Sequence, residues 1–308
     1  MRDQQNQSSN QPSLYSQVTD KIIAELELGI VPWIQPWGSE EGSIGLGLPR
    51  NARTSKAYSG INILLLWSAI LQGGYASQQW LTFKQALELG GCVRKGEKGW
   101  TVCYADSFIP KDEKDRVSKD GGDPQSISFL KRYTVFNVAQ CDGLPEDIFQ
   151  QSMPTDEREL IPRAEALIAA TGACFQIGGE IACYIPSLDA IRVPSQTAFH
   201  DQINYYRTVF HELGHWTGHT TRLARELTVK FASDGYAREE LVAELATAFV
   251  CASLGIVPTV RHADYIGNWL QVLRDDARAI FRAASMATKA SDFILAFEQN
   301  PLVAEVAA

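Results

Sequence analysis

Residues 211–215 read His-Glu-Leu-Gly-His, an order of side chains suited to binding a metal ion. On a helix, His211 and His215 lie on one face because they are four residues apart, so both imidazoles can bind one cation of the size of Zn²⁺. Glu212 lies beside them, where its carboxylate can activate water for attack on a carbonyl group. The alternative is a helix whose histidines only pack or cap. The motif predicts a metal site in which Glu212 is the catalytic residue.

A zinc site needs a third protein ligand. His219 is one candidate, but the metzincin pattern H-E-x-x-H-x-x-G-x-x-H places its last histidine at position 221, which is a threonine here. The stronger candidates are Glu240 and Glu244, which share one face of a predicted helix over 239–249. Glu244 lies in an otherwise apolar run, where a carboxylate without a partner would be costly. A histidine of the metal site would satisfy it.

Two alternatives for these glutamates stay open. Glu239 and Glu240 can form an exposed pair, and Glu244 can pair with an arginine such as Arg222 or Arg225.

The run Glu240-x-x-Ala243-Glu244 resembles the gluzincin peptidases, in which H-E-x-x-H is followed on a later helix by E-x-x-A-D/N or E-x-x-x-D. The resemblance implies that Glu240 binds the metal and that Glu244 orients a ligand histidine. A glutamate stands here in place of the last aspartate, so the two roles are open to exchange. Tyr236 is expected close to the metal without binding it, either as a donor to an oxyanion or as a packing residue. The expected cofactor is Zn²⁺, and two histidines with one carboxylate also suit Mn²⁺ or Co²⁺.

The first half of the chain has a different chemical character. The whole chain of 308 residues has a net charge of −8, which argues against wholesale nonspecific binding to nucleic acid. The segment 50–104, however, has seven basic and two acidic residues, and five of the seven tryptophans lie within the first 100 residues. Rings that stack on bases and cations that contact phosphates are what single-stranded DNA binding requires. The alternative is that the tryptophans form the core, which we expect for Trp33 and Trp67.

The residues predicted to contact DNA are Arg50, Arg53, Lys56, Tyr58, Trp80, Phe83, Lys84, Arg94, Lys95, Lys98 and Trp100. Those at 94–99 belong to a tight basic turn whose glycines allow the backbone to approach a phosphate.

The pattern of apolar residues predicts an α+β protein of two domains, in keeping with its length. We expect a disordered tail over 1–13, an α+β single-stranded-DNA-binding domain over 14–148, and a helix-rich zincin-like domain with a small antiparallel sheet over 149–308. Helices are predicted over 14–28, 61–72, 82–89 and 156–171, and strands over 101–109, 131–138 and 190–193. Residues 174–178 and 181–185 are predicted to form a hairpin. The segment 189–193 could present a strand edge to an extended peptide.

The predicted compartment is the cytoplasm. The first residues lack the apolar core of a signal peptide, and no apolar run reaches the ~18–20 residues of a membrane span. The six cysteines form no C-x-x-C pair and are expected to be reduced and mostly buried. We therefore expect no membrane partner.

Short runs along the chain carry a further resemblance. Residues 30–33, 49–52, 58–62, 80–86, 93–99 and 135–138 read IVPW, PRNA, YSGIN, WLTFKQA, VRKGEKG and VFNV. These runs resemble the N-terminal single-stranded-DNA-binding domain of ArdC-type antirestriction proteins. Residues 211–216 and 236–245, which read HELGHW and YAREELVAEL, are similar to the metallopeptidase-type domain that follows it in that family.

The resemblance implies a protein of plasmids and other mobile elements that binds single-stranded DNA and protects incoming DNA from host restriction. Its expected partners are single-stranded DNA and, if it is a peptidase, a host restriction protein or another DNA-bound protein. Two alternatives remain: a DNA-directed metalloprotease that cleaves proteins held on DNA, and a non-enzymatic DNA-binding protein with a structural metal. Glu212 favours hydrolysis, because a structural site needs no glutamate between its histidines.

Overall fold

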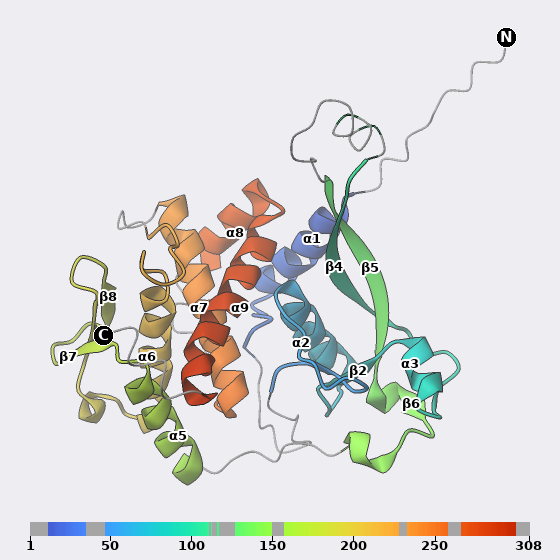
Figure 1. Cartoon of the computed structure of the whole chain (residues 1–308), viewed down its shortest axis with the longest axis horizontal. Helices are drawn as coiled ribbons and strands as arrows, with labels where there is room; N and C mark the ends of the chain where they lie inside the picture. Colours follow the sequence, from blue (N-terminus) through green and yellow to red (C-terminus); the bar gives the residue numbers. More distant parts are fainter. Residues whose placement is uncertain are drawn as a thin grey trace.

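A computed structural model describes residues 12–34, 47–110, 112, 116, 127–149, 157–227, 233–257 and 266–299 (Figure 1). The elements of the N-terminal half are α1 (Leu14–Glu27), β1 (Arg50–Asn51), α2 (Ile61–Gly73), β2 (Gln79–Leu81), α3 (Phe83–Glu88), β3 (Cys92–Val93), β4 (Trp100–Phe108), β5 (Ile127–Asn137), η1 (Val138–Gln140), β6 (Cys141–Asp142) and η2 (Glu146–Phe149). The elements of the C-terminal half are α5 (Glu157–Ala170), β7 (Cys174–Ile177), β8 (Cys183–Ile185), β9 (Ala190–Val193), η3 (Gln196–Ala198), α6 (Gln202–Trp216), α7 (Asp234–Leu254), α8 (Ile266–Asp275) and α9 (Ala279–Gln299). The predicted helices and strands of both halves are present, with bounds that differ by a few residues.

Local sequence signals explain where the N-terminal helices begin. The Ser13 hydroxyl accepts from the backbone N–H of Ser16 at the start of α1. Helix α3 begins with a capping box, in which Thr82 accepts from the backbone N–H of Gln85 and the Gln85 side chain accepts from the backbone N–H of Thr82. Helix α2 is apolar on nearly all sides and is buried along most of its length. It is therefore the central helix of this half.

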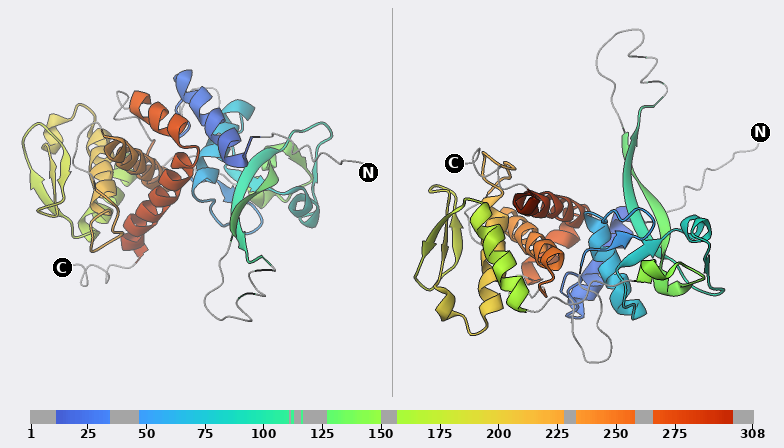
Figure 2. Two further views of the ribbon diagram at one scale, coloured as in Figure 1. Left: turned by 90° about the horizontal axis from the view of Figure 1, so that it is seen from above. Right: turned by 60° about the horizontal axis from the view of Figure 1, so that its bottom comes forward.

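A four-stranded sheet in the order β1-β2-β5-β4 packs against α2. Strands β4 and β5 form a long antiparallel hairpin, paired from Trp100 opposite Val135 to Phe108 opposite Ile127. Figures 1 and 2 show this hairpin extending beyond the helices. The polar segment that joins the two strands lies, except for residues 112 and 116, outside the described residues.

The C-terminal half is mostly helical, with α6, α7 and α9 side by side and a three-stranded sheet on the outer face of α6 (Figure 2). The predicted antiparallel sheet is wrong in one respect, because its order is β7-β9-β8 and β7 runs parallel to β9. The predicted hairpin of β7 with β8 is therefore also wrong. Strand β9 takes the centre because Ala190, Ile191 and Val193 are buried, whereas the residues of β7 and β8 are exposed or half-buried.

One hydrophobic cluster, the shared core, joins the two halves. Its larger members from the N-terminal half are Ile22, Leu26, Trp33, Leu64 and Trp67, and those from the C-terminal half are Leu241, Leu245, Phe249, Trp269 and Ile280. Trp67 meets Phe249 edge to face with ring centroids 5.8 Å apart. Trp33 meets Trp269 in the same way at 5.7 Å. The prediction that Trp33 and Trp67 are core residues is confirmed, and α1, α2, α7, α8 and α9 are packed as one body.

Two sequence predictions fall partly outside the described residues. The expected tail over 1–13 is described only at residues 12 and 13, and residues 150–156, next to the expected domain boundary, are not described. All six cysteines are free, and three of them are buried while Cys92 and Cys174 are exposed, so the expectation of mostly buried thiols is only half met. Within the described residues, no helix is both long and apolar enough to cross a membrane.

Candidate metal centre

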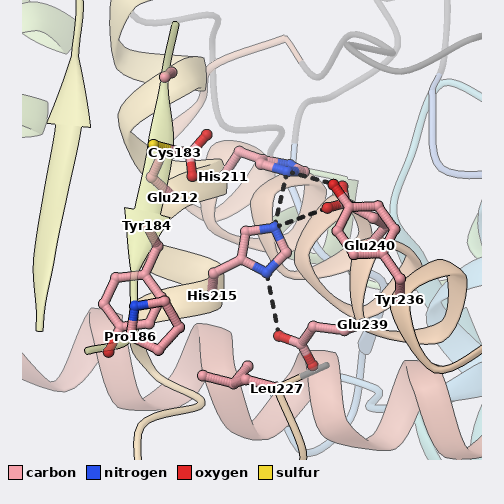
Figure 3. A pocket seen from close by; sticks show the side chains of 11 residues that line it. Cys183, Tyr184, Pro186, His211, Glu212, His215, Leu227, Tyr236, Glu239 and Glu240 are labelled. Atoms are coloured by element: carbon pink, nitrogen blue, oxygen red, sulfur yellow. Dashed lines mark hydrogen bonds and ion pairs between the residues drawn. The ribbon is translucent and has the colours of Figure 1, made fainter. Parts of the chain in front are cut away.

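Helix α6 presents both histidines of the motif to helix α7. The two Nε2 atoms of His211 and His215 face each other at 3.2 Å. The Glu240 carboxylate reaches across from α7, with one oxygen 3.4 Å from His211 Nε2 and the other 3.5 Å from His215 Nε2 (Figure 3). One potential ligand atom from each of these three residues lies within 4.8 Å of the other two. Two imidazole nitrogens and a carboxylate oxygen so placed can hold one divalent cation.

A glycine allows the two helices to approach this closely. A Cβ atom built on Gly214 would lie 3.2 Å from the Cα and 3.4 Å from the Cβ of Ala243. That contact is tight for a side chain, so a larger residue at 214 would push α6 away from α7. The glycine between the two histidines thus sets the distance over which Glu240 reaches them.

Buried carboxylates hold the far side of each imidazole. Glu244 lies 3.5 Å from His211 Nδ1, and Glu239 accepts a hydrogen bond from His215 Nδ1 at 3.2 Å. Such contacts fix the orientation of a histidine that binds metal through its other nitrogen. Both carboxylates are buried, at 3% and 8% exposure.

Arg225 binds Glu239 with two hydrogen bonds, of 2.7 and 3.0 Å. The same guanidinium donates to the carbonyl oxygen of Gly214 and to the hydroxyl of Thr217, so it ties the loop after α6 to both helices. Sequence reasoning missed the roles of Glu239 and Arg225. Glu239 was considered only as part of an exposed pair, and the contact with Arg225 depends on how the loop after α6 folds back.

The contacts of the described residues bear on the alternatives for Glu244 and His219. Arg222 binds Asp189, Arg225 binds Glu239, and Glu244 lies beside His211. His219 follows α6 and its ring contacts the hydroxyl of Thr221, away from the cluster of His211, His215 and Glu240.

The acidic surroundings change the proton affinity of the cluster. Burial opposes a charge on His215, but hydrogen bonds to Glu239 and Glu240 outweigh it and raise the pKa of His215 to about 10. Burial likewise opposes a charge on His211, while Glu240 and Glu244 raise its pKa. Burial would raise the pKa of Glu240, yet the two histidines lower it well below its ordinary value. The cluster is therefore arranged for a positive charge held between carboxylates.

The cluster lies in a cavity of about 270 Å³. Glu212 lines it on the side of β8, next to Cys183, and Tyr236 lines it beside Glu240 (Figure 3). Strand β8 contributes Tyr184 as well, so the strand edge next to the cluster belongs to β8. The predicted edge over 189–193 is wrong, because β9 is paired on both sides.

The predicted DNA-contacting residues lie on three parts of the N-terminal half. Arg50, Arg53, Lys56 and Tyr58 lie on β1 or in the turn after it, Trp80, Phe83 and Lys84 on β2 and α3, and Arg94, Lys95, Lys98 and Trp100 in the turn before β4 or at its start. Lys56, Lys95 and Lys98 are exposed, as are Phe83 and Lys84.

Several of these residues are buried or make contacts within the protein. Trp80 is fully buried, at 0% exposure, because β2 lies inside the sheet, so its predicted stacking on bases is wrong. Arg94 binds Glu97, Asp142 and the carbonyl oxygen of Ala139. Arg53 is ion-paired with Glu88, and half-buried Trp100 donates from Nε1 to the Tyr75 hydroxyl.

Comparison with known proteins finds two family models that match separate parts of the chain. The model for the N-terminal domain of anti-restriction factor ArdC matches residues 12–136, and the model for a zincin-like metallopeptidase matches residues 162–286. The crystal structure of the metal-free antirestriction ArdC protein from plasmid R388 is 40% identical and superposes with a TM-score of 0.78 over 93% of this chain and 98% of that one. The Mn(II)-bound structure of that protein gives a TM-score of 0.76 at the same identity, over 94% of this chain and 99% of that one.

Curated relatives include a DNA primase TraC of Escherichia coli, 40% identical over 94% of this chain and 27% of its own length, and a second TraC of that species, 40% identical over 92% and 20%. The chain thus spans about a quarter or less of these primases. An uncharacterized protein of Sinorhizobium fredii, y4eC, is 40% identical over 93% of both chains. With its ArdC N-terminal domain, its zincin-like domain and this likeness over nearly the whole length of the R388 protein, the chain belongs to the family of ArdC antirestriction proteins.

Proposed function

We propose that the C-terminal domain is a metal-dependent peptidase, with His211, His215 and Glu240 as ligands and Glu212 as general base. The observation that carries the proposal is the meeting of two imidazole nitrogens and a buried carboxylate in a cavity that Glu212 also lines. The donor set fits a divalent cation, because two neutral histidines with one carboxylate leave a net positive site among buried acids. Mn(II) is bound in the solved relative, and Zn²⁺ suits the same ligands.

A divalent cation bound there supplies Lewis-acid chemistry, which acidifies water and polarises a carbonyl group. The Glu212 carboxylate accepts the proton of the attacking water and passes it to the leaving amine. Tyr236, which lines the cavity beside Glu240, donates a hydrogen bond from its hydroxyl to the oxyanion that forms on the substrate. Glu239 and Glu244 keep the imidazoles oriented throughout. The edge of β8 is the surface on which an extended peptide can pair.

The test is to compare Glu212→Gln with Glu146→Gln, an exposed glutamate of the N-terminal half, after loading each protein with Mn²⁺ or Zn²⁺. We expect Glu212→Gln to bind metal like the unmodified protein and to lose cleavage of a peptide library, because it keeps the shape of the side chain but cannot accept the proton. Undiminished cleavage by Glu212→Gln would refute its role as base. Metal bound with no cleavage by the unmodified protein would favour a structural metal.

We further propose that the N-terminal domain binds single-stranded DNA and that the protein thereby protects incoming DNA from restriction in the cytoplasm. The turn before β4 supports this, because Lys95 and Lys98 are exposed and have no ion-pair partner among the described residues. Lys84, on α3, adds a cation whose side chain is 86% exposed and whose ammonium lies 3.7 Å from the Glu88 carboxylate. Binding of a labelled oligothymidylate, measured at several salt concentrations, tests the proposal, since phosphate contacts make the affinity fall with salt.

A further inference from the structure

The β4–β5 hairpin exposes aromatic rings on one of its two faces. Residues directly opposite each other in an antiparallel pair share a face. Tyr104 is opposite Lys131, and Tyr133 is opposite Val102, two residues along each strand, so all four side chains lie on the same face. Tyr104 is 60% exposed and Tyr133 is 48% exposed. Their rings meet edge to face, with centroids 6.4 Å apart and planes at 85°.

The two tyrosine rings lie outside the hydrophobic core. On the same face, Val102 and Val135 are buried in the cluster under α2, whereas the tyrosines lie beyond its cover. An edge-to-face pair leaves flat ring surface open, and flat ring surface is where a nucleobase stacks. Among the described residues of this face, the exposed side chains are aromatic or charged and none is aliphatic, which favours nucleobases over an apolar protein surface.

Cations lie beside the tyrosine pair and at the foot of the hairpin. Toward the tip, Lys131 Nζ lies 5.1 Å from the ring centre of Phe129 and 3.1 Å from Asp106. At the foot of the hairpin, the turn with Lys95 and Lys98 leads directly into β4. Lys98 is six positions before Tyr104, and β4 begins only at Trp100, so their Cα atoms are at most about 22 Å apart. An oligonucleotide that reaches both would meet the exposed lysines of the turn and the stacking rings of the hairpin.

We propose that Tyr104 and Tyr133 form a stacking site for the bases of single-stranded DNA, an inference that rests on the proposed DNA binding of this domain. Neither residue is among those predicted from the sequence to contact DNA. The pair supplies contacts to bases, while the exposed lysines supply contacts to phosphates. Because every base has a flat face, the site accepts any sequence.

The test compares the double variant Tyr104→Ala/Tyr133→Ala with the matched control Tyr104→Phe/Tyr133→Phe, which keeps both rings. The probe is a fluorescent oligothymidylate about 15 nucleotides long, and the readout is anisotropy. One stacked base contributes at least about 1 kcal/mol, or about 5-fold in affinity, so the alanine variant should bind ~25-fold more weakly. The phenylalanine control should bind within about twofold of the unmodified protein. The slope of log affinity against log salt should stay unchanged, because no phosphate contact is removed.

Affinity of the alanine variant within about twofold of the unmodified protein would overturn the inference and leave DNA binding by the domain intact. Absence of binding by the unmodified protein would instead refute the proposed function. Photo-crosslinking of an oligonucleotide with 5-iodouracil to the unmodified protein is an independent measurement that needs no variant. We expect the crosslinked peptides to contain Tyr104 or Tyr133, and crosslinks confined to other peptides would overturn the inference.

Discussion

Replacement of Glu239 by glutamine tests whether the contact behind His215 controls metal binding. Glu239 is 8% exposed and accepts from His215 Nδ1 at 3.2 Å and from Arg225 at 2.7 and 3.0 Å. Glutamine keeps the shape but removes the charge, so His215 loses a charged acceptor. Loss of such a contact weakens metal binding by about 10- to 100-fold, or ~1.4–2.7 kcal/mol.

The same substitution also lowers the stability of the fold. The Arg225 side chain is only 6% exposed and loses its charged partner, but it keeps the carbonyl oxygen of Gly214 and the hydroxyl of Thr217 as acceptors. A hydrogen bond to a charged group contributes about 1.5–3 kcal/mol, which sets the expected loss of stability.

The assay is isothermal titration of the metal-free protein with Mn²⁺, together with the Tm measured with and without Mn²⁺. Glu226→Gln is the control, because that glutamate is exposed on the loop after α6. We expect Glu239→Gln to show weaker Mn²⁺ binding and a smaller rise of Tm on adding metal, and the control to match the unmodified protein. If Glu239→Gln bound Mn²⁺ as tightly as the control, the reasoning about this carboxylate would be refuted.

Further predictions concern the rest of the candidate metal centre and the proposed DNA-binding surface. Glu212→Ala should keep DNA binding and metal binding but lose peptidase activity, and full protection of DNA by this variant in a conjugation assay would show that proteolysis is not needed for protection. Gly214→Ala should lower both Tm and Mn²⁺ affinity, because its Cβ would meet α7 at 3.2 Å, and an unchanged Mn²⁺ titration would contradict this. Because the pKa of His215 is raised to about 10, this histidine is protonated in the metal-free protein at neutral pH. Metal binding should therefore release a proton, and the metal affinity should rise ~10-fold per pH unit. Titration in buffers of different ionisation enthalpy would detect the released proton. The same proton stabilises the metal-free fold most below pH 6.5, and this contribution is lost as the pH rises through about 10. Reversing the charges of Lys95 and Lys98 should weaken binding to oligothymidylate and flatten its salt dependence, and an unchanged salt slope would rule out their contact with phosphate.

The pair of His211 and His215 could be predicted because helical periodicity places them together, whereas Glu240 was expected as a ligand only from the resemblance to gluzincin peptidases. The position of Glu244 beside His211 followed from the need of a carboxylate in an apolar run for a partner. The helices could be predicted from caps and apolar spacing, as at Thr82. The pairing between strands was harder to predict, since the centre of the small sheet is taken by the strand with the most buried residues, β9.

Features that depend on the tertiary fold could not be predicted from local sequence patterns. Composition marks Trp80 as a candidate for stacking, but only the position of β2 inside the sheet shows that it is buried. The exposure of Tyr104 and Tyr133 depends on how far along the hairpin α2 packs, and no local sequence pattern predicts that distance.

The shared core also bears on how this pair of domains can be inherited. A recombination joint in the segment between η2 and α5 would separate Trp67 from Phe249 and Trp33 from Trp269, and each product would expose aromatic surface that the other had covered. A newly acquired domain would have to cover that aromatic surface with complementary side chains. Gene rearrangements that preserve folding should therefore move the two domains together and attach additional modules outside the pair, so that the proposed DNA-binding surface and the candidate metal centre are inherited as one unit.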